Sequence, residues 1–136
     1  MKYEFLEHLS DAKFRAYGKS FEECFANAAE AMTKVMTDPE KIEEKLTKSV
    51  QVSGTDLKQL LYSFLEELLF LLDTQNFILH KVTDIKIVPK GRGYFLSATL
   101  SGDSVDDKYE METGIKAVTY MDMEVKENYV QVVVDI

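Results

Sequence analysis

The chain has 136 residues, 46% of them hydrophobic and 29% charged, which suits one globular domain with a sizeable core. Its formal net charge of -8 argues against direct nucleic-acid binding, which needs a basic patch, and favours a basic protein partner or cations. No apolar run approaches the roughly 20 residues that cross a bilayer, and no signal-peptide core follows Met1. The single cysteine, Cys24, excludes an internal disulfide. We therefore expect a cytoplasmic protein that contacts no membrane.

Two short strands and a helix are predicted for the first part of the chain. Apolar and polar side chains alternate over residues 2–8 and again over 12–17, as in strands with one buried face. Ser20 and Glu23 then form a capping-box pair, which marks the first turn of a helix. Because apolar residues recur at helical spacing after this pair, we expect a helix over 21–36.

A second, more apolar helix is predicted after a charged connection. Residues 39–48 carry charges of both signs and indicate exposed surface, before a strand over 46–52. Thr55 can cap the next helix, with Asp56 in its first turn. Leucine and phenylalanine occupy most of the circumference of residues 57–72. We therefore expect this helix to be largely buried, or to lie between the sheet and another element.

The second half of the chain predicts strands joined by turns. The expected strands are 77–88, 94–100, 115–125 and 129–136. Gly91 and Gly93 belong to a hairpin turn. A loop over 101–107 opens an acidic segment that lacks the ligand order of an EF-hand, so we expect that segment to be solvated. Its acidic residues are Asp103, Asp106, Asp107, Glu110 and Glu112.

The last strand is the most strand-like stretch of the sequence. Val132, Val133 and Val134 do not alternate with polar residues, which predicts a strand covered on both faces near the middle of a sheet. The element order is then β-β-α-β-α-β-β-β-β, without repeat or linker. This order indicates a single-domain α+β fold, with two α-helices packed on a mostly antiparallel sheet.

Few side chains are candidates for catalysis or for binding a metal or a phosphate group. His8 and His80 do not stand at metal-ligand spacing from each other or from Cys24, so we expect no zinc site. No glycine-rich phosphate loop is present, because Gly91 and Gly93 belong to a turn. Spacing alone leaves a Ser-His-Asp arrangement open, although no serine stands out.

Three oxygen-bearing groups stand at strand ends: the side chains of Asp11 and Asp135 and the carboxylate of Ile136. In an antiparallel sheet the start of one strand lies beside the end of its neighbour. If the strand after Asp11 neighbours the last strand, these groups converge, and oxygen ligands favour calcium or magnesium over zinc. The alternative is that each group points into solvent at the rim of the sheet.

Four stretches resemble the archease family. Residues 7–12, E-H-L-S-D-A, resemble the E-H-T-A-D segment near the start of archeases. Residues 115–125, I-K-A-V-T-Y-M-D-M-E-V, resemble the family's V-K-A-V-T-Y-H-D-M segment. The tail V-V-V-D-I and the helical segment 61–68, L-Y-S-F-L-E-E-L, are also similar to their counterparts. These pieces occur in the family's order across the whole chain, so the resemblance implies one archease-like domain over residues 1–136.

The resemblance implies a non-enzymatic protein cofactor that activates an RtcB-type RNA ligase in tRNA splicing or RNA repair. Such a cofactor promotes guanylylation of the ligase and its multiple turnover, while the ligase carries the GTP and manganese chemistry. The family's cation site is usually assigned to calcium and uses the aspartate of E-H-T-A-D and the two C-terminal residues. Carried over, the ligands of Ca2+ are Asp11, Asp135 and Ile136, the last through a main-chain or terminal oxygen. The resemblance implies no catalytic residue.

The chain departs from the family at several matched positions, and two other functions stay open. Residues 9–10 are Leu-Ser where the family has Thr-Ala, and Met121 and Tyr109 stand where it often has histidines. One alternative function is a metal-dependent small hydrolase that uses Asp11 and Asp135 as general acid and base. The other is a chaperone-like module that binds exposed apolar segments of other proteins.

Overall fold

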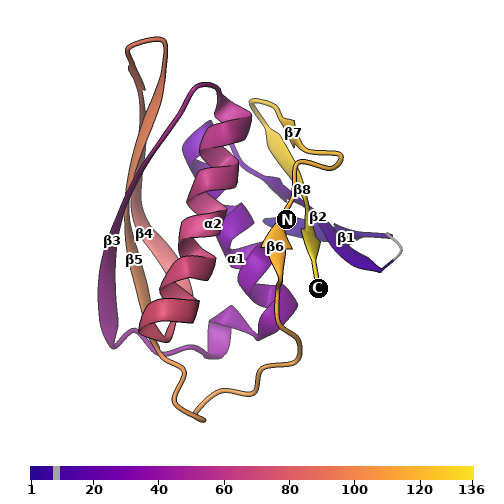
Figure 1. Ribbon diagram of the computed structural model, residues 1–136, viewed down its shortest axis with the longest axis vertical. Helices are drawn as coiled ribbons and strands as arrows, with labels where there is room; N and C mark the ends of the chain where they lie inside the picture. The colour runs from indigo at the N-terminus through magenta and orange to yellow at the C-terminus, as the bar shows by residue number, and fades with distance from the viewer. Residues whose placement is uncertain (8–9) are drawn as a thin grey trace.

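The computed structural model describes residues 1–7 and 10–136, and this part of the chain forms three layers. Two α-helices lie between two β-sheets, one of five strands and one of three (Figure 1). Every strand pairing in the described ranges is antiparallel. His8, which was considered as a zinc ligand, and Leu9, which stands where the archease family has threonine, lie outside the described residues. The α+β class with two α-helices is confirmed, and the strands form two sheets where the sequence suggested one.

The five-stranded sheet is built around the end of the chain. Its strands are β1 (Tyr3–Leu6), β2 (Asp11–Tyr17), β6 (Ala117–Val118), β7 (Glu124–Val125) and β8 (Tyr129–Asp135). The order is β1-β2-β8-β6, with β7 also paired to β8. Strand β8 therefore lies inside the sheet, and Val132, Val133 and Val134 are fully buried, as the uninterrupted apolar run predicted.

The three-stranded sheet has the order β3-β5-β4. Its strands are β3 (Leu46–Gly54), β4 (Phe77–Lys90) and β5 (Gly93–Ser104). The β4–β5 hairpin extends past the helices at one end of the molecule (Figure 1). Register shifts between Leu79 and Lys81 and between Val82 and Asp84 interrupt the β4–β5 ladder. Such bulges bend a strand.

The two α-helices begin where polar side chains cap them. Helix α1 (Phe21–Met36) starts as predicted, because the Glu23 N–H donates to Ser20 Oγ at 3.1 Å. A short 3₁₀ helix, η1 (Pro39–Lys41), follows it. Helix α2 (Leu57–Gln75) is capped by Asp56, whose Oδ1 accepts the Gln59 N–H at 2.8 Å. The prediction of Thr55 as the cap was wrong, because the carboxylate one residue later reaches the third amide of the helix.

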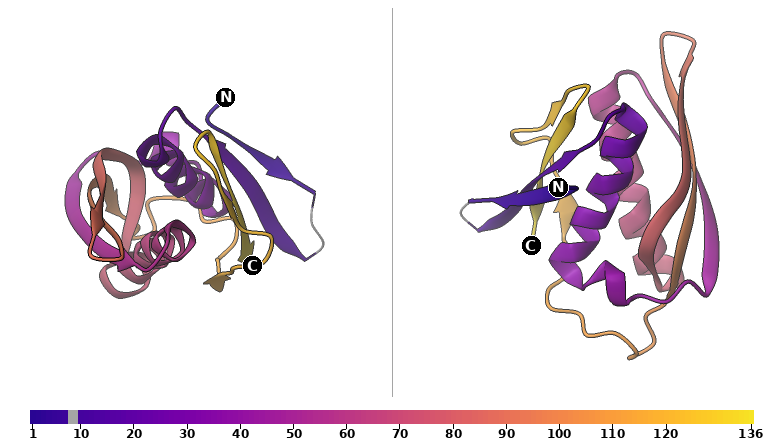
Figure 2. Two further views of the ribbon diagram at one scale, coloured as in Figure 1. Left: turned by 90° about the horizontal axis from the view of Figure 1, so that it is seen from above. Right: turned by 180° about the vertical axis from the view of Figure 1, so that it is seen from behind.

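The core fills both spaces between the helices and the sheets. Phe25 of α1 and Phe64 of α2 stack with ring centroids 6.5 Å apart, and both are fully buried. Each such side chain contributes on the order of 2–3 kcal/mol through burial. Figure 2 shows the helices enclosed from two sides, which explains why α2 is apolar around most of its circumference. No helix in residues 1–7 and 10–136 is long and apolar enough to span a membrane.

Two expected elements differ in extent. The predicted strand over 115–125 is two strands of two residues each, β6 and β7, because a turn intervenes at Asp122, which has a φ of 52°. The predicted loop over 101–107 begins later, because β5 continues to Ser104 and Gly102 pairs with both flanking strands. This extension was not predicted because glycine, serine and aspartate have a low intrinsic preference for strands.

Candidate metal centre

Strands β2 and β8 are neighbours, and their register places Asp11 directly opposite Asp135. Cross-strand partners project from the same face of a sheet. Because Val132 and Val134 belong to the core between this sheet and the helices, Asp135 and Asp11 project from the other side, here called the outer face. Both aspartates are partly exposed there. The condition on which the carboxylate hypothesis depended, adjacency of the two strands, is therefore met.

The chemistry of this pair suits a divalent cation. Two carboxylates directly opposite each other repel, and a bound cation would offset that cost. Carboxylate and main-chain oxygens are the ligands that calcium takes in proteins. Ile136, which is 39% exposed, follows Asp135 and offers main-chain oxygen only. No group of three His, Cys, Asp or Glu side chains suited to a metal occurs within residues 1–7 and 10–136, and the predicted set draws only two ligands from such side chains.

The segment before β7 lies along the other side of β8. Ala117 pairs with Asp135, and the Lys116 N–H donates to the Asp135 carbonyl oxygen at 2.7 Å. The Thr119 hydroxyl and N–H both donate to the Val133 carbonyl oxygen, at 2.8 and 3.1 Å. Asp135 is therefore held between Asp11 on one side and the 116–119 segment on the other.

The turn after this segment exposes two large apolar side chains beside the sheet. Tyr120 is 51% exposed and Met121 is 53% exposed. The Tyr120 ring stacks on Tyr62 of α2, with centroids 4.4 Å apart and an interplanar angle of 8°. Lys13 Nζ lies 3.4 Å from Asp122 Oδ2, which ties the turn to β2. These contacts fix the turn between α2 and the outer face.

A polar network on the outer face joins β2, β7 and β8 around Gln131, which is only 3% exposed. Arg15 Nη2 donates to Gln131 Oε1 at 2.6 Å, and Gln131 Nε2 donates to the Asp122 carbonyl oxygen at 2.8 Å and to Glu124 Oε2 at 3.1 Å. The Arg15 guanidinium also lies 4.4 Å from the centroid of the Tyr129 ring. The Tyr129 hydroxyl donates to Glu124, which raises the pKa of Tyr129 and lowers the pKa of Glu124.

This network was not predicted, although the sequence contains a pattern that indicates it. Lys13 and Arg15 belong to the predicted strand over 12–17, and Asp11 precedes Lys13 by the same interval of two residues, so the three share a face in β2. The same spacing places Asp135 and Gln131 on one face of the last strand. Combining the two patterns would have placed a basic and amide network next to the carboxylate pair.

The acidic segment is only partly solvated, so the prediction was wrong for Asp103. This residue lies on β5 and is 5% exposed. Its Oδ2 accepts hydrogen bonds from the Tyr109 hydroxyl at 2.6 Å and from Lys108 Nζ at 3.0 Å. These two bonds lower the pKa of Asp103 to about 2, with a smaller contribution from the Ser104 N–H. The cluster ties the 105–116 segment to the end of β5.

His80 and Cys24, the other candidate side chains, make contacts that stabilise the fold. His80 Nδ1 lies 2.8 Å from the Pro39 carbonyl oxygen, and His80 Nε2 lies 3.5 Å from Glu44 Oε1. Cys24 is fully buried on α1, and this burial raises the pKa of its thiol. A thiol in that state is a poor nucleophile and a poor metal ligand.

Fold and site together define a small α+β protein in which two antiparallel sheets enclose two α-helices and two strand ends present a carboxylate pair. The model of the Archease protein family (MTH1598/TM1083) matches residues 3–136. The chain belongs to the archease family.

Solved and curated relatives cover nearly the same length. The protein archease of Methanothermobacter thermautotrophicus is 41% identical over 123 residues, covering 90% of this chain and 87% of the relative. The protein archease of Pyrococcus abyssi is 38% identical over 126 residues, covering 92% and 88%. The solution structure of Methanobacterium thermoautotrophicum protein 1598 superposes with a TM-score of 0.83 at 34% identity and covers 99% of both chains.

Proposed function

We propose that this chain is a non-catalytic, cytoplasmic cofactor that activates an RtcB-type RNA ligase in tRNA splicing or RNA repair. In this role it promotes guanylylation of the ligase and its multiple turnover. The observation that carries the proposal is membership of the archease family over residues 3–136, together with the Asp11–Asp135 pair in the position that the resemblance implies.

The proposed cation is Ca2+, held by the carboxylates of Asp11 and Asp135 and by a main-chain oxygen of Ile136. When bound, the ion neutralises the facing carboxylates and fixes the start of β2 against the end of β8. Since the Lys116 N–H and Ala117 pair with Asp135, the same ion also orders the segment that leads to the turn at Tyr120.

The turn beside the cation is the proposed contact with the ligase. Exposed apolar side chains that are held in place are typical of protein interfaces. Tyr120 satisfies both conditions, because it is about half exposed and stacked on Tyr62, and the adjacent Met121 is also about half exposed. The net charge of -8 favours a basic surface on the partner over direct contact with RNA.

The test is a ligation assay with the cognate ligase at limiting concentration and RNA in excess. Added wild-type protein should raise the number of turnovers per ligase, whereas Asp11→Asn and Asp135→Asn should each abolish most of this stimulation. Asp84→Asn removes an exposed carboxylate from the other sheet and should stimulate like the wild type. Full stimulation by both Asp11→Asn and Asp135→Asn would rule out the role of the cation site.

The two alternative functions give different results. Metal-dependent turnover of a small ester by this chain alone, lost in Asp11→Asn, would favour the hydrolase. Suppression of the aggregation of an unrelated unfolded protein, without any effect on the ligase, would favour the chaperone-like module.

A further inference from the structure

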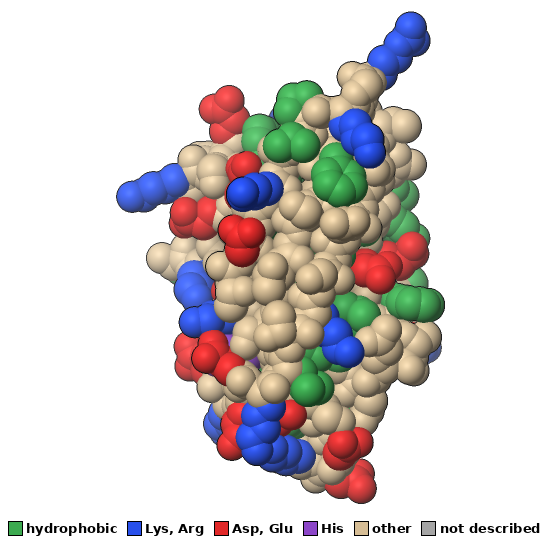
Figure 3. Space-filling view, turned by 90° about the vertical axis from the view of Figure 1, so that its left-hand side faces the viewer, with side chains coloured by type: hydrophobic (Ala, Val, Ile, Leu, Met, Phe, Trp, Pro, Cys, Tyr) green, Lys and Arg blue, Asp and Glu red, His purple; other side chains and the backbone are tan. Residues whose placement is uncertain are grey.

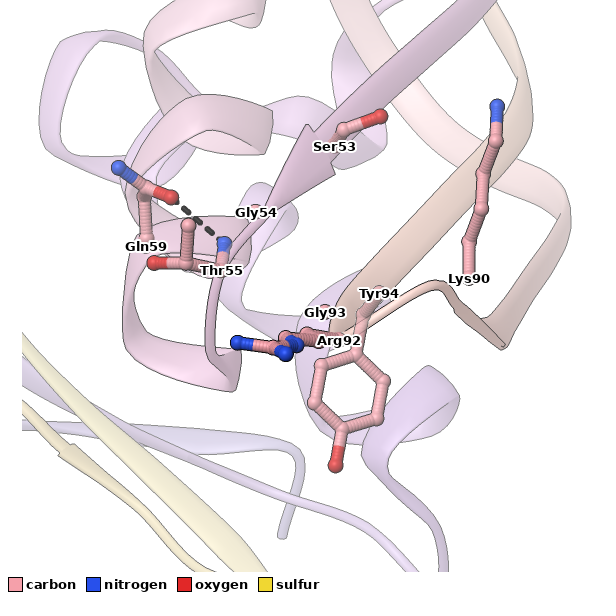
Figure 4. A pocket seen from close by; sticks show the side chains of 8 residues that line it. All are labelled: Ser53, Gly54, Thr55, Gln59, Lys90, Arg92, Gly93 and Tyr94. Atoms are coloured by element: carbon pink, nitrogen blue, oxygen red, sulfur yellow. Dashed lines mark hydrogen bonds between the residues drawn. The ribbon is translucent and has the colours of Figure 1, made fainter.

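A groove lies at the end of the molecule where the β4–β5 hairpin projects. It has a volume of about 560 Å³ and runs between the hairpin tip and the turn that joins β3 to α2 (Figure 4). It belongs to the three-stranded sheet, whereas Asp11 and Asp135 belong to the five-stranded sheet. The proposed ligase-activating role therefore assigns no function to this groove.

Gly54 and Gly93, which pack closely against each other, form the floor of the groove. A side chain on Gly93 would place its Cβ 2.2 Å from the carbonyl oxygen of Gly54. Gly91 begins the hairpin turn with a φ of +61°, a conformation that L side chains rarely adopt. The hairpin tip therefore lies directly on the backbone of β3, and a fixed main-chain floor is left open to solvent.

The groove is basic in an acidic chain. Its lining includes Lys90 and Arg92 and, within the described residues, no acidic side chain. Residues 85–102 carry three basic and no acidic side chains, although the whole chain has 24 acidic residues. The acidic residue on the facing turn is Asp56, whose Oδ1 accepts the Gln59 N–H. In Figure 3 basic side chains lie beside hydrophobic ones at the upper end of this face.

The polar groups of the groove are chiefly hydrogen-bond donors. Arg92 is exposed and, in residues 1–7 and 10–136, makes no hydrogen bond or ion pair, whereas Arg15 is engaged by Gln131. Gln59 Oε1 accepts the Thr55 N–H at 2.6 Å, so the amide nitrogen of Gln59 remains a donor. The hydroxyls of Ser53 and Thr55 add two more.

The side chains of Arg92 and Lys90 point in different directions. Figure 4 shows the Arg92 guanidinium extending toward Thr55, while Lys90 points away from it. Lys90 Nζ lies instead 4.9 Å from the centroid of the Phe95 ring. Arg92 is therefore the cation available to a ligand in the groove. Its planar guanidinium carries a fork of donors that matches two oxygens of a phosphate group.

We propose that this groove binds a small phosphate ester of nucleotide size. Its volume lies within the range of pockets for such ligands, and Tyr94 supplies an apolar wall for the organic part. A net charge of -8 disfavours a long polyanion such as RNA, whereas one phosphate meets only the local basic field. This inference does not depend on the proposed ligase-activating function.

The experiment is a titration of the 15N-labelled full chain with AMP, followed by amide chemical shifts. We expect shifts confined to the 53–59 and 90–94 segments, and no comparable shifts with adenosine, which lacks the phosphate. Arg92→Gln should weaken AMP binding about tenfold, the effect of losing a charge-assisted pair of hydrogen bonds. Lys90→Gln should have a smaller effect. Lys19→Gln, which removes an exposed lysine outside the groove, should bind AMP like the wild type.

Several results would overturn the proposal. Absence of shifts with AMP at millimolar concentration would exclude the ligand class. Equal shifts with adenosine would show that the phosphate is not recognised. An unchanged affinity in Arg92→Gln would remove the assigned recognition residue. Binding of a single-stranded oligouridylate without any response to AMP would identify a polyanion site in place of the proposed one.

Discussion

Asp11 and Asp135 are direct partners in the β2–β8 ladder, so their side chains leave the sheet on the same face. On an antiparallel sheet a like-charged pair in this position costs up to about 1 kcal/mol. Strand β8 is also held on its other side by Ala117, so the sheet limits how far the two carboxylates can separate. Binding of a cation by this pair should therefore be measurable as a gain in stability.

Calcium should stabilise the wild-type chain and leave the carboxylate variants unaffected. Ligand binding at a free concentration 100-fold above Kd adds about 2.7 kcal/mol to the free energy of unfolding. Asp135→Asn should lose this gain, because a neutral amide is a weaker calcium ligand than a carboxylate. Thermal melts with Ca2+ and with chelator test both statements.

Asp84→Asn serves as the matched control for these melts, because Asp84 is exposed on β4. Its melting temperature should respond to calcium as the wild type does. A calcium response that survives in both Asp11→Asn and Asp135→Asn would place the ion elsewhere.

Gln131→Met should destabilise the chain by about 1–3 kcal/mol. Methionine has a similar volume but removes the acceptor for Arg15 and the donor to the Asp122 carbonyl oxygen, and Gln131 is buried. The amides of residues 120–123 should also exchange faster with solvent, because the turn loses its link to β8. Urea unfolding and hydrogen exchange are the measurements. Gln51→Met, at an exposed site on β3, should stay within about 0.5 kcal/mol of the wild type.

Local patterns predicted those features of the fold that depend on neighbours in sequence. Ser20 and Glu23 predicted the start of α1, and the run Val132–Val134 predicted a strand inside a sheet. The division into two sheets could not be predicted in this way, because apolar periodicity shows which face of a strand is buried but not which strand pairs with it. The apolar circumference of α2 was the one sign that two layers cover the helices.

The candidate site was predictable to a similar extent. Asp11 and Asp135 came from their places at strand ends, and the register then fixed them as partners. Asp103 was misjudged because its hydrogen bonds come from Lys108 and Tyr109, which a chain reversal brings back beside β5. Nothing in the local sequence distinguishes this buried aspartate from its exposed neighbour Asp107.

The stability of the chain should decrease as the pH falls from about 4 to about 2, because Asp103 becomes protonated in this range. Its pKa is lowered from an ordinary value of 3.8 to about 2, so the stabilisation is complete above the ordinary value and is lost as the pH falls toward 2. Tyr109→Phe removes the largest cause of the shift and should flatten the loss between about pH 4 and pH 2. Urea midpoints measured across this range provide the test. Asp107→Asn should keep the wild-type slope, and an equal slope in Tyr109→Phe would contradict the assignment.

Gly93→Ala should destabilise the chain by about 1–3 kcal/mol, the range for a side chain forced into a packed position. The new Cβ would meet the Gly54 carbonyl oxygen at 2.2 Å, and this neighbour is backbone that can move only by shifting β3 or the hairpin. Gly114→Ala is the matched control, because a Cβ at that position has no neighbour within 4 Å. Its free energy of unfolding should change by less than about 0.5 kcal/mol. If urea unfolding gave the two variants equal stability, the hairpin tip would not rest on β3, and the floor of the groove would be mobile.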